Sequence, residues 1–543
     1  MRRSSWWFLL ISAVTPLLLL WPLPRVFTSA LLTRTDFEAS THIWGLWAAW
    51  RLHSPLVIDT TLLAWPGGVR FVLVDPANIV WMNLGLALGG VAGGYNLTLY
   101  MGFFLTGIAG GLLAKRAGGS PWLGALAAQA CPTLLSAPAR GMTEELGLCW
   151  VGLALAAWLW CSDRPDLRRT ALAALAAAAC AYSGPYNGVW IALLGLPVIA
   201  LALAQRRWRA AAHLVGAGLA ALALTAPLLT ALAARQAEQS GGSGHAMVAL
   251  EPYYPQFRGG IPFGADLLDV FLPLPLTGGL ADAPSTAYIG IVALLAAAWG
   301  ARRWRAGWLW IAASLAVAAL SLGPRLHLAG EDLGLIGPAG LLMGALSGLG
   351  TLSRWSRLGA VAHLLLIPPI SRLSGRLRFV AAAGLLLDVL LLSPLQWPLV
   401  TAAPPDPHVW AALPGPGAVL ELPPRQSIAP SRLHWREVGL LSQVSHGRPI
   451  STSTMQLPLD PGGREALAAA RLLLSGQGLP AERRAAMLGS GFRYLAVHTT
   501  HQPTGERGAA HLAHCLGAPL VEGEALLVYA LAPSTGDCGS APR

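Results

Sequence analysis

Residues 96–116 read NLTLYMGFFLTGIAGGLLAKR: an apolar run without a charged side chain, closed by Lys115 and Arg116. A helix needs about 20 apolar residues to cross a bilayer. Basic residues directly after such a run mark its cytoplasmic end. This stretch therefore predicts a membrane-spanning helix and also gives its direction.

Similar runs lie on both sides of this segment. Only 12% of the residues are charged and 54% are apolar, about half the usual charge of a soluble domain, which excludes an ordinary soluble enzyme, a disordered chain and a small disulfide scaffold. We expect a polytopic all-α membrane protein with about 11 spans, range about 9–13. The other apolar runs are 6–24, 78–93, 120–137, 144–161, 168–183, 187–204, 210–233, 287–300, 306–323, 358–371 and 379–395.

The basic residues gather in short clusters between these runs. All clusters fall on the cytoplasmic side if 78–93 is a re-entrant or surface-lying helix, with the N-terminus cytoplasmic and the C-terminus outside. If 78–93 spans the membrane instead, one cluster must lie outside. The net charge of +11 then reports topology, and no nucleic-acid partner is expected. The clusters are Lys115-Arg116, Arg164 with Arg168-Arg169, Arg206-Arg207-Arg209, Arg302-Arg303-Arg305, and Arg372 with Arg376 and Arg378.

The acidic residues show the opposite distribution. Of the sixteen that precede residue 401, thirteen fall in the expected outer loops, mainly at 25–77 and 234–286. Long loops of this kind are usually functional or disordered. The outer loops of a membrane domain spanning residues 1–400 are therefore where chemistry is expected.

The composition changes at about residue 401. A Pro-rich linker, TAAPPDPHVWAALPGPG, precedes strand-like runs at 418–423, 493–498 and 525–532 that alternate with helical runs at 465–475 and 481–488. This pattern predicts an extracytoplasmic soluble α/β domain over 401–543. Cys515 and Cys538 both lie in it, and in an oxidising compartment we expect them to pair; two free thiols are the alternative.

The segment TRTDFEASTHIWGLWAAWRLHSP, residues 33–55, carries the main catalytic candidates. Asp36 and Glu38 are expected just outside the membrane, where a carboxylate can accept a proton from an acceptor hydroxyl or hold a divalent cation. Helix capping is the alternative reading. The tryptophans that follow, together with His42, suit a helix at the lipid–water interface.

Other candidates to bind substrate lie in later outer loops. Arg354 and Arg357 suit a phosphate clamp because guanidinium binds phosphate bidentately, although snorkelling at the interface explains them equally. Glu144 and Glu145 either line the same substrate cavity as these arginines or place negative charge at the N-terminus of the following helix. Tyr253 and Tyr254 are candidates to contact substrate, or else belong to an ordered loop.

Asp388 and the group around His511 each have a structural explanation. Asp388 lies inside a span, where a carboxylate is a functional candidate, but a hydrogen-bonded structural role fits as well. His511, His514 and Cys515 lack matching ligands elsewhere, so no metal site is predicted. The chain contains no P-loop, no GxGxxG after a strand and no HExxH. No nucleotide cofactor is therefore expected, and a divalent metal stays open.

The layout resembles the GT-C superfamily of membrane glycosyltransferases, which includes protein O-mannosyltransferases, oligosaccharyltransferases and aminoarabinose transferases. The shared features are a first helix, a long acidic outer loop, a surface-lying aromatic helix and many further spans. The later segments resemble bacterial putative GT-C and YfhO-like membrane proteins. These are AWPGGVRF (64–71), TAYIGIVALLAAAWG (286–300), SLGPRLHLAG (321–330), TLSRWSRLGAV (351–361), GAVLELPP (417–424), HGRPIS (446–451) and FRYLAVH (492–498).

The resemblance implies a polyprenyl-phosphate-linked sugar donor, with Asp36 as the catalytic carboxylate and Glu38 as its partner. It implies transfer to an acceptor glycan, lipid or protein on the outer face of the bacterial inner membrane. Asp-x-Glu departs from the better-known Asp-Asp, Glu-Asp and Asp-x-Asp forms. An inactive scaffold of the same shape is one alternative. A transporter or flippase is another, although essentially one mid-membrane acid and no internal repeat speak against transport.

Overall fold

The computed structural model describes most of the chain. The described residues are 4–33, 36–73, 75–241, 264–272, 287–346, 349, 355–392, 397–411, 413–422, 438–451, 461–475, 480–499, 506–523, 526–531 and 538. Within helices, the side chains of 4–6, 36–38, 139–140, 235–241, 438, 461 and 506–509 are not described. Tyr253, Tyr254 and Arg354 lie outside the described residues.

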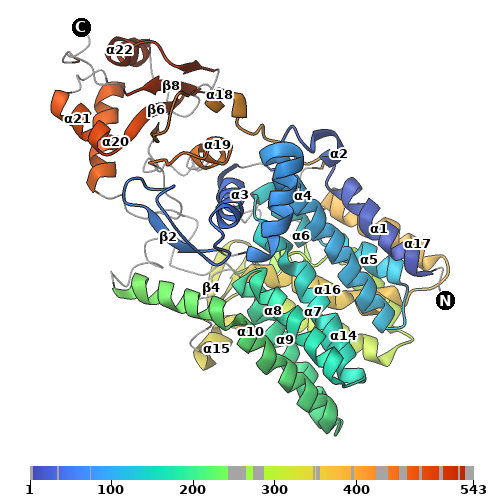
Figure 1. Cartoon of the computed structure of the whole chain (residues 1–543). Helices are drawn as coiled ribbons and strands as arrows, with labels where there is room; N and C mark the ends of the chain where they lie inside the picture. The colour runs from blue at the N-terminus through green and yellow to red at the C-terminus, as the bar shows by residue number, and fades with distance from the viewer. Residues whose placement is uncertain are drawn as a thin grey trace. The chain divides into compact units, whose positions relative to one another are not determined.

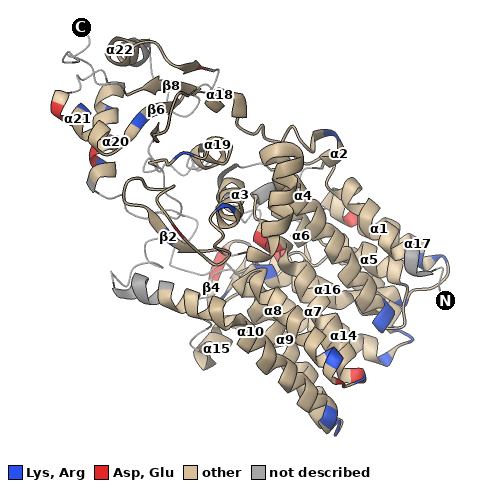
Figure 2. Ribbon diagram, viewed as in Figure 1, with Lys and Arg blue, Asp and Glu red and all other residues tan. Residues whose placement is uncertain are grey.

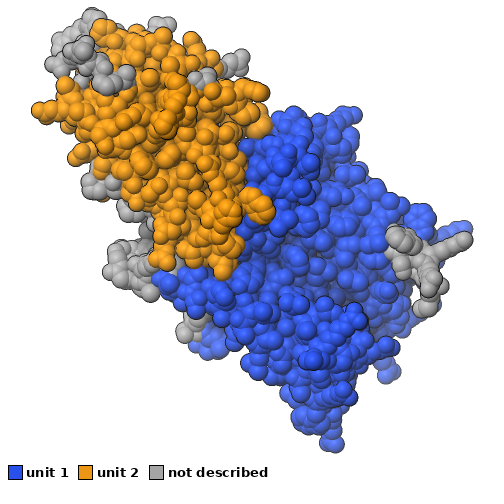
Figure 3. Space-filling view, in the orientation of Figure 1, with its two compact units in different colours: residues 1–34, 74–402 blue, residues 35–73, 403–543 orange. Residues whose placement is uncertain are grey.

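The chain divides into two compact units, coloured separately in Figure 3. Unit 1 contains Met1–Arg34 and Val74–Ala402, and unit 2 contains Thr35–Leu73 and Ala403–Arg543. The composition change at residue 401 coincides with the second crossing between units. The first outer loop, expected within a membrane domain of residues 1–400, contributes Thr35–Leu73 to the same unit as the C-terminal residues.

Unit 1 is a helical bundle (Figure 1). Its first half contains α1 (Ser4–Leu19), α2 (Leu23–Val26), η1 (Pro76–Asn78), α4 (Ile79–Arg116), α5 (Pro121–Gln129), α6 (Pro132–Arg140), η2 (Thr143–Gly147), α7 (Leu148–Asp163), α8 (Leu167–Tyr182), α9 (Pro185–Ala204) and α10 (Trp208–Gly241). Its second half contains α11 (Leu267–Phe271), α13 (Ile291–Ala301), α14 (Arg305–Ser321), β3 (Arg325–Leu328), β4 (Glu331–Ile336), α15 (Pro338–Ala345), η6 (Trp355–Arg357), α16 (Leu358–Ser371), α17 (Leu377–Leu387) and the π-helix η7 (Asp388–Leu392).

Among the described residues, four helices are long and apolar enough to cross a membrane. They are Pro76–Arg116, Thr143–Asp163, Pro185–Ala204 and Trp208–Ala234, and shorter apolar helices accompany them. The chain is therefore a helical membrane protein, and the expected total of about 11 spans stays a prediction. The run 120–137 differs from its expected form, because it is broken into α5 and α6 before Pro132, where proline disfavours a continuous helix.

Helix α4 reverses sharply within its length. Gly89 and Gly90 leave the helical region, Gly90 with φ of 62°. A Cβ added at Gly94 would lie 2.9 Å from the Met82 carbonyl oxygen, so the residues before the break lie against those after it. Residues 79–88 thus double back on the rest of α4. A re-entrant segment was one of the two forms expected for 78–93.

Unit 2 is built on a four-stranded sheet in the order β5-β6-β8-β7. β5 (Ala418–Leu422) pairs in parallel with β6 (Phe492–His498), and β8 (Leu526–Ala530) lies antiparallel to both β6 and β7 (Val521–Glu522). The remaining elements are α3 (Asp36–Arg51), the hairpin strands β1 (Val57–Thr60) and β2 (Val69–Val72), α18 (Pro407–Ala411), α19 (Val438–His446), α20 (Pro461–Leu474), α21 (Ala481–Gly489) and α22 (Glu506–Leu516).

Two tryptophans tie the early segment of unit 2 to its C-terminal part. The Trp44 indole nitrogen donates to Gln443 Oε1 at 2.5 Å, and that of Trp65 donates to the Ser490 carbonyl at 2.6 Å. Trp44 is fully buried, whereas Trp50 on the same helix is 57% exposed. The expectation that α3 presents its tryptophans to lipid is therefore wrong for Trp44, because its indole N–H is used inside the protein.

Candidate functional site

The most distinctive polar cluster of unit 1 is formed by Arg357, Glu144 and Glu145. Arg357 Nε donates to Glu145 Oε1 at 3.1 Å, and its Nη2 donates to Glu144 Oε1. Nη2 also lies 3.5 Å from the Met142 sulfur. The three charged side chains are 6–15% exposed. The structure thus joins Arg357 to two adjacent sequence candidates that lie more than 200 residues before it.

The local sequence ARGMTEELG explains how the two glutamates reach this position. Helix α6 stops because Gly141 adopts the left-handed conformation, with φ of 75°, which costs glycine little. The chain then forms η2 before α7 begins. At the end of η2, a Cβ on Gly147 would collide with Asn187 at the start of α9. Glycine at this position therefore lets η2 pack closely on α9.

Aromatic rings cover the cluster. The Arg357 guanidinium carbon lies 5.1 Å from the centre of the Tyr186 ring, a cation–π contact. The ring centre of Trp190 lies 5.6 Å from that of Trp355 and 6.3 Å from that of Tyr186. Burial lowers the pKa of Arg357, but Glu144 and Glu145 more than offset this, so the pKa is raised overall. Arg357 is therefore a permanent cation in an apolar setting.

One hydrogen-bonding edge of Arg357 stays available. Nε and Nη2 are occupied, while Nη1 makes no hydrogen bond to the residues that the structure describes. The glutamates therefore fix the guanidinium plane and leave its two Nη1 protons for another acceptor. Chemically, the cluster suits a single oxyanion held against a positioned arginine.

Asp75 joins the cluster from the start of the α4 segment and was not among the residues singled out from sequence. Thr143 Oγ1 donates to Asp75 Oδ2 at 2.5 Å, and Asn78 Nδ2 donates to the same oxygen at 3.4 Å. Asp75 is fully buried. It anchors the residue that precedes Glu144. The only local signal was its position directly before Pro76 and a helix.

The expected catalytic pair lies in unit 2. Asp36 is the first residue of α3 and Glu38 lies in its first turn, and the side chains of both are outside the described part. His42, one turn further along, is 9% exposed and so is buried rather than open to solvent. The roles of these residues stay predictions.

Asp388 has a structural explanation. Its Oδ1 accepts from the Tyr288 hydroxyl at 2.8 Å, and Oδ2 accepts from the Val292 backbone N–H at 3.2 Å. Val292 lies in the first turn of α13, so the carboxylate satisfies a backbone donor that the helix cannot pair internally. Asp388 therefore secures the start of α13.

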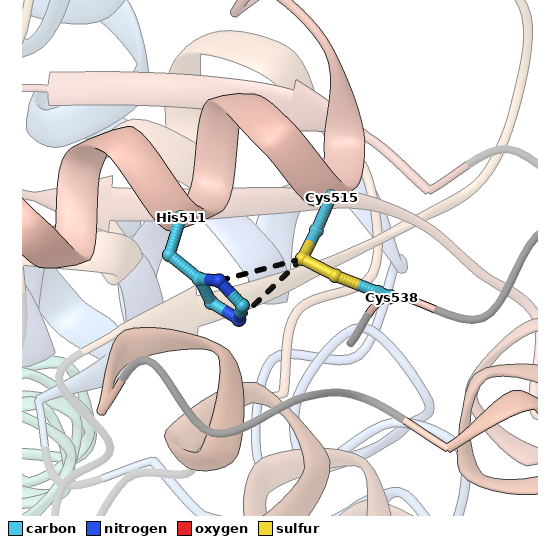
Figure 4. A group of neighbouring side chains, drawn as sticks. All are labelled: His511, Cys515 and Cys538. Carbon is cyan, nitrogen blue, oxygen red and sulfur yellow. Dashed lines mark hydrogen bonds between the residues drawn. A yellow bond between two sulfur atoms is a disulfide. The ribbon is translucent and has the colours of Figure 1, made fainter. Parts of the chain in front are cut away.

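Cys515 and Cys538 form a disulfide in unit 2, with His511 beside it (Figure 4). The Cys515 sulfur lies 3.5 Å from His511 Nε2. These three residues are the one group of His, Cys, Asp or Glu side chains in the described part that is close enough to share a metal ion. With both sulfurs bonded to each other, neither is the thiolate that a metal needs.

Comparisons with known proteins returned only structural similarities. No protein-family model matches the chain, and no curated protein sequence matches it. The mycobacterial arabinofuranosyltransferase AftD is 17% identical with a TM-score of 0.48, over 97% of this chain and 40% of AftD. The chain thus spans less than half the length of that protein.

Two other similar structures are an oligosaccharyltransferase and ArnT. The oligosaccharyltransferase of Archaeoglobus fulgidus is 13% identical with a TM-score of 0.48, over 90% of this chain and 68% of that one. ArnT from Cupriavidus metallidurans bound to undecaprenyl phosphate is 14% identical with a TM-score of 0.45, over the full length of both chains. Because every score is below 0.5, we base the proposed function on the residues of this chain.

Proposed function

We propose that the chain is a GT-C-type membrane glycosyltransferase. It moves a sugar from a polyprenyl-phosphate-linked donor to an acceptor on the outer face of a bacterial inner membrane. The observation that carries the proposal is the buried Arg357, which Glu144 and Glu145 fix in place while Nη1 stays available. A lipid-linked phosphate is the oxyanion that a protein with membrane-spanning helices meets at such a site.

Arg357 holds the donor phosphate in this proposal. Two carboxylates already orient the guanidinium, so little side-chain entropy is lost when a phosphate oxygen binds to Nη1. The same contact stabilises the phosphate as negative charge develops on it during bond cleavage. Arg354 is proposed to assist, and His42, Tyr253 and Tyr254 are proposed to contact the sugar or the acceptor.

The proposed reaction is a direct displacement at the anomeric carbon. The Asp36 carboxylate takes the proton from the acceptor hydroxyl as the acceptor oxygen attacks the anomeric carbon. The bond from that carbon to the phosphate oxygen breaks, and polyprenyl phosphate leaves with the electron pair. Glu38 assists Asp36 by raising its basicity through like charge.

The test uses the purified full-length protein in nanodiscs with polyprenyl-phosphate-linked hexoses and pentoses. Asp36→Asn is expected to lower kcat by about 10²–10⁴-fold, the usual loss for a general base, while polyprenyl phosphate binds unchanged. Arg357→Lys is expected to weaken polyprenyl phosphate binding, because lysine lacks the planar fork. Glu331→Gln, an exposed position in β4, is the matched control for loss of one negative charge.

Each outcome separates the candidate functions. Unchanged turnover in Asp36→Asn overturns the catalytic role of Asp36. Binding of polyprenyl phosphate without transfer from any donor favours the inactive scaffold. Movement of a fluorescent lipid-linked sugar between leaflets, without transfer, favours the flippase.

A further inference from the structure

A second polar feature of unit 1 lies at the other end of α16 from Arg357. A cavity of about 560 Å³ opens where the α4–α5, α13–α14 and α16–α17 connections meet. Arg303, Arg372 and Arg378 line it, together with Trp122 and Trp304. Figure 2 shows further basic residues of unit 1 at the ends of α9 and α10.

Arg372 contacts neutral groups in this cavity. Arg372 Nη1 donates to the Gly118 carbonyl at 3.3 Å, and its guanidinium lies 4.9 Å from the centre of the Trp304 ring. Arg378 Nε is buried and has no hydrogen-bond partner in the part that the structure describes. No lining residue is acidic. Three arginines thus line one cavity that has no acidic residue in its lining.

The nearby acids are already occupied. Asp163 pairs with Arg116, and Asp166 pairs with Arg169 while also capping α8. Like charges that line one cavity repel one another. An anion that enters the cavity relieves this repulsion.

The surroundings of the cavity favour an anion attached to an apolar chain. Trp122 on its wall stacks on Phe379 with ring centres 5.5 Å apart. Phe379 and the adjacent Val380 are 65% and 66% exposed, which suits contact with acyl chains in a membrane-spanning unit. A basic cavity bordered by apolar, outward-facing helix surface matches a phospholipid headgroup with its tails alongside.

We propose that this cavity binds the phosphate group of an anionic phospholipid. Arg303 and Arg378 hold the phosphate oxygens, Arg372 and the two tryptophans shape the wall, and the acyl chains run along Phe379 and Val380. By the positive-inside rule this end of unit 1 faces the cytoplasm, so the lipid belongs to that leaflet. The proposed site is independent of the donor site at Arg357.

The test measures lipid binding to the purified full chain in neutral detergent by native mass spectrometry. Short-chain phosphatidylglycerol and phosphatidylcholine are titrated separately, and inorganic phosphate serves as the soluble source of the same group. The double variant Arg303→Gln with Arg378→Gln removes the cavity charges. Arg206→Gln with Arg209→Gln is the matched control, since these exposed residues carry the same charge at the same end but do not line the cavity.

The cavity variant is expected to lose at least about tenfold in phosphatidylglycerol affinity, because a single lost charge-assisted hydrogen bond is already worth about tenfold or more. The control is expected to stay within about twofold, because exposed charges are screened. Equal losses in both variants overturn the proposal, as does equal affinity for the two lipids. If inorganic phosphate binds as tightly as phosphatidylglycerol, the lipid assignment is wrong.

A folding defect is separated from lost binding with Arg378→Lys. This variant keeps the charge, and its unfolding temperature without lipid reports whether the fold is intact. It is expected to bind phosphatidylglycerol more weakly than the wild type because lysine offers no bidentate fork. Unchanged affinity in this variant and in the cavity variant together contradicts the proposal.

Discussion

Helix α16 has an arginine at each end, and the two are held in opposite ways. Arg357, before its first turn, is 12% exposed and paired with two glutamates. Arg372, after its last turn, is exposed, contacts a carbonyl and a tryptophan ring, and shares its cavity with two more arginines. The ends lie about 20 Å apart at 1.5 Å per residue. A buried cation requires a fixed counter-charge, whereas an exposed group of cations is open to a mobile one.

The two ends of α16 also use arginine for different purposes. At the Arg357 end, the protein supplies the negative charges itself, so the guanidinium is oriented before any ligand arrives. At the Arg372 end, the charge is left uncompensated among the described residues, so the ligand supplies the balance. The first arrangement suits precise placement of a reacting phosphate, and the second suits retention of a headgroup.

The largest expected effect is on the buried end. Arg357→Met removes the guanidinium charge that pairs with the buried Glu144 and Glu145, and breaking a buried ion pair costs about 3–5 kcal/mol. Arg372→Met, which removes an exposed arginine, is expected to cost less than about 1 kcal/mol. Thermal unfolding of the two purified variants, compared with the wild type, measures the difference.

A triple variant tests the cause of that loss. Arg357→Met combined with Glu144→Gln and Glu145→Gln removes all three charges and is expected to recover most of the stability, without polyprenyl phosphate binding. A triple variant as unstable as Arg357→Met alone would show that packing, and not the loss of the Arg357 charge beside the glutamates, explains the cost.

A second prediction concerns a buried carboxylate that pairs with no arginine among the residues that the structure describes. Asp269 in α11 is 3% exposed, and burial, with the charge of Asp266 as a smaller cause, raises its pKa to about 6. Because the folded pKa lies above the ordinary value of 3.8, folding favours the protonated form. The contribution of Asp269 to the stability of the fold is therefore complete below about pH 4 and is lost as the pH rises towards 6.

Asp269→Asn is expected to remove that fall. Above about pH 7 the variant should be about 1–3 kcal/mol more stable than the wild type, and the gain should vanish near pH 4. Unfolding temperatures from pH 4 to 8 measure it, with Glu331→Gln as the exposed control. A gain that is constant across this range would contradict the titration of Asp269.

The sequence predicted the apolar helices of the bundle, because apolar runs closed by basic clusters are local features. It also selected Arg357, Glu144 and Glu145 as separate candidates. Their pairing could not be predicted, since 212 residues separate Glu145 from Arg357 and Arg140 stood closer in sequence. Asp75 was passed over for the same reason, as its partner Thr143 lies 68 residues away.

The first outer loop shows where composition misleads. Its tryptophans read as an interfacial pattern, yet Trp44 pairs with Gln443, 399 residues further along the chain. A local pattern cannot tell a tryptophan that faces lipid from one that faces another part of the protein, because both require an apolar ring with one polar atom. The domain boundary therefore followed composition at residue 401, while the contacts place Thr35–Leu73 with the C-terminal residues.

The smallest expected effect is the change in stability when the cavity arginines are replaced. Whether the variant is more or less stable than the wild type decides the prediction. Without anionic lipid, Arg303→Gln with Arg378→Gln relieves repulsion between arginines, so the variant should equal or exceed the wild type in stability, by up to about 1 kcal/mol. The gain should shrink between 50 mM and 1 M salt, because ions screen exposed charges. Added phosphatidylglycerol should reverse the order, since it stabilises only the protein that binds it. A variant less stable than the wild type in neutral detergent at every salt concentration would mean that these arginines serve the fold, and the contrast between the two ends of α16 would fail.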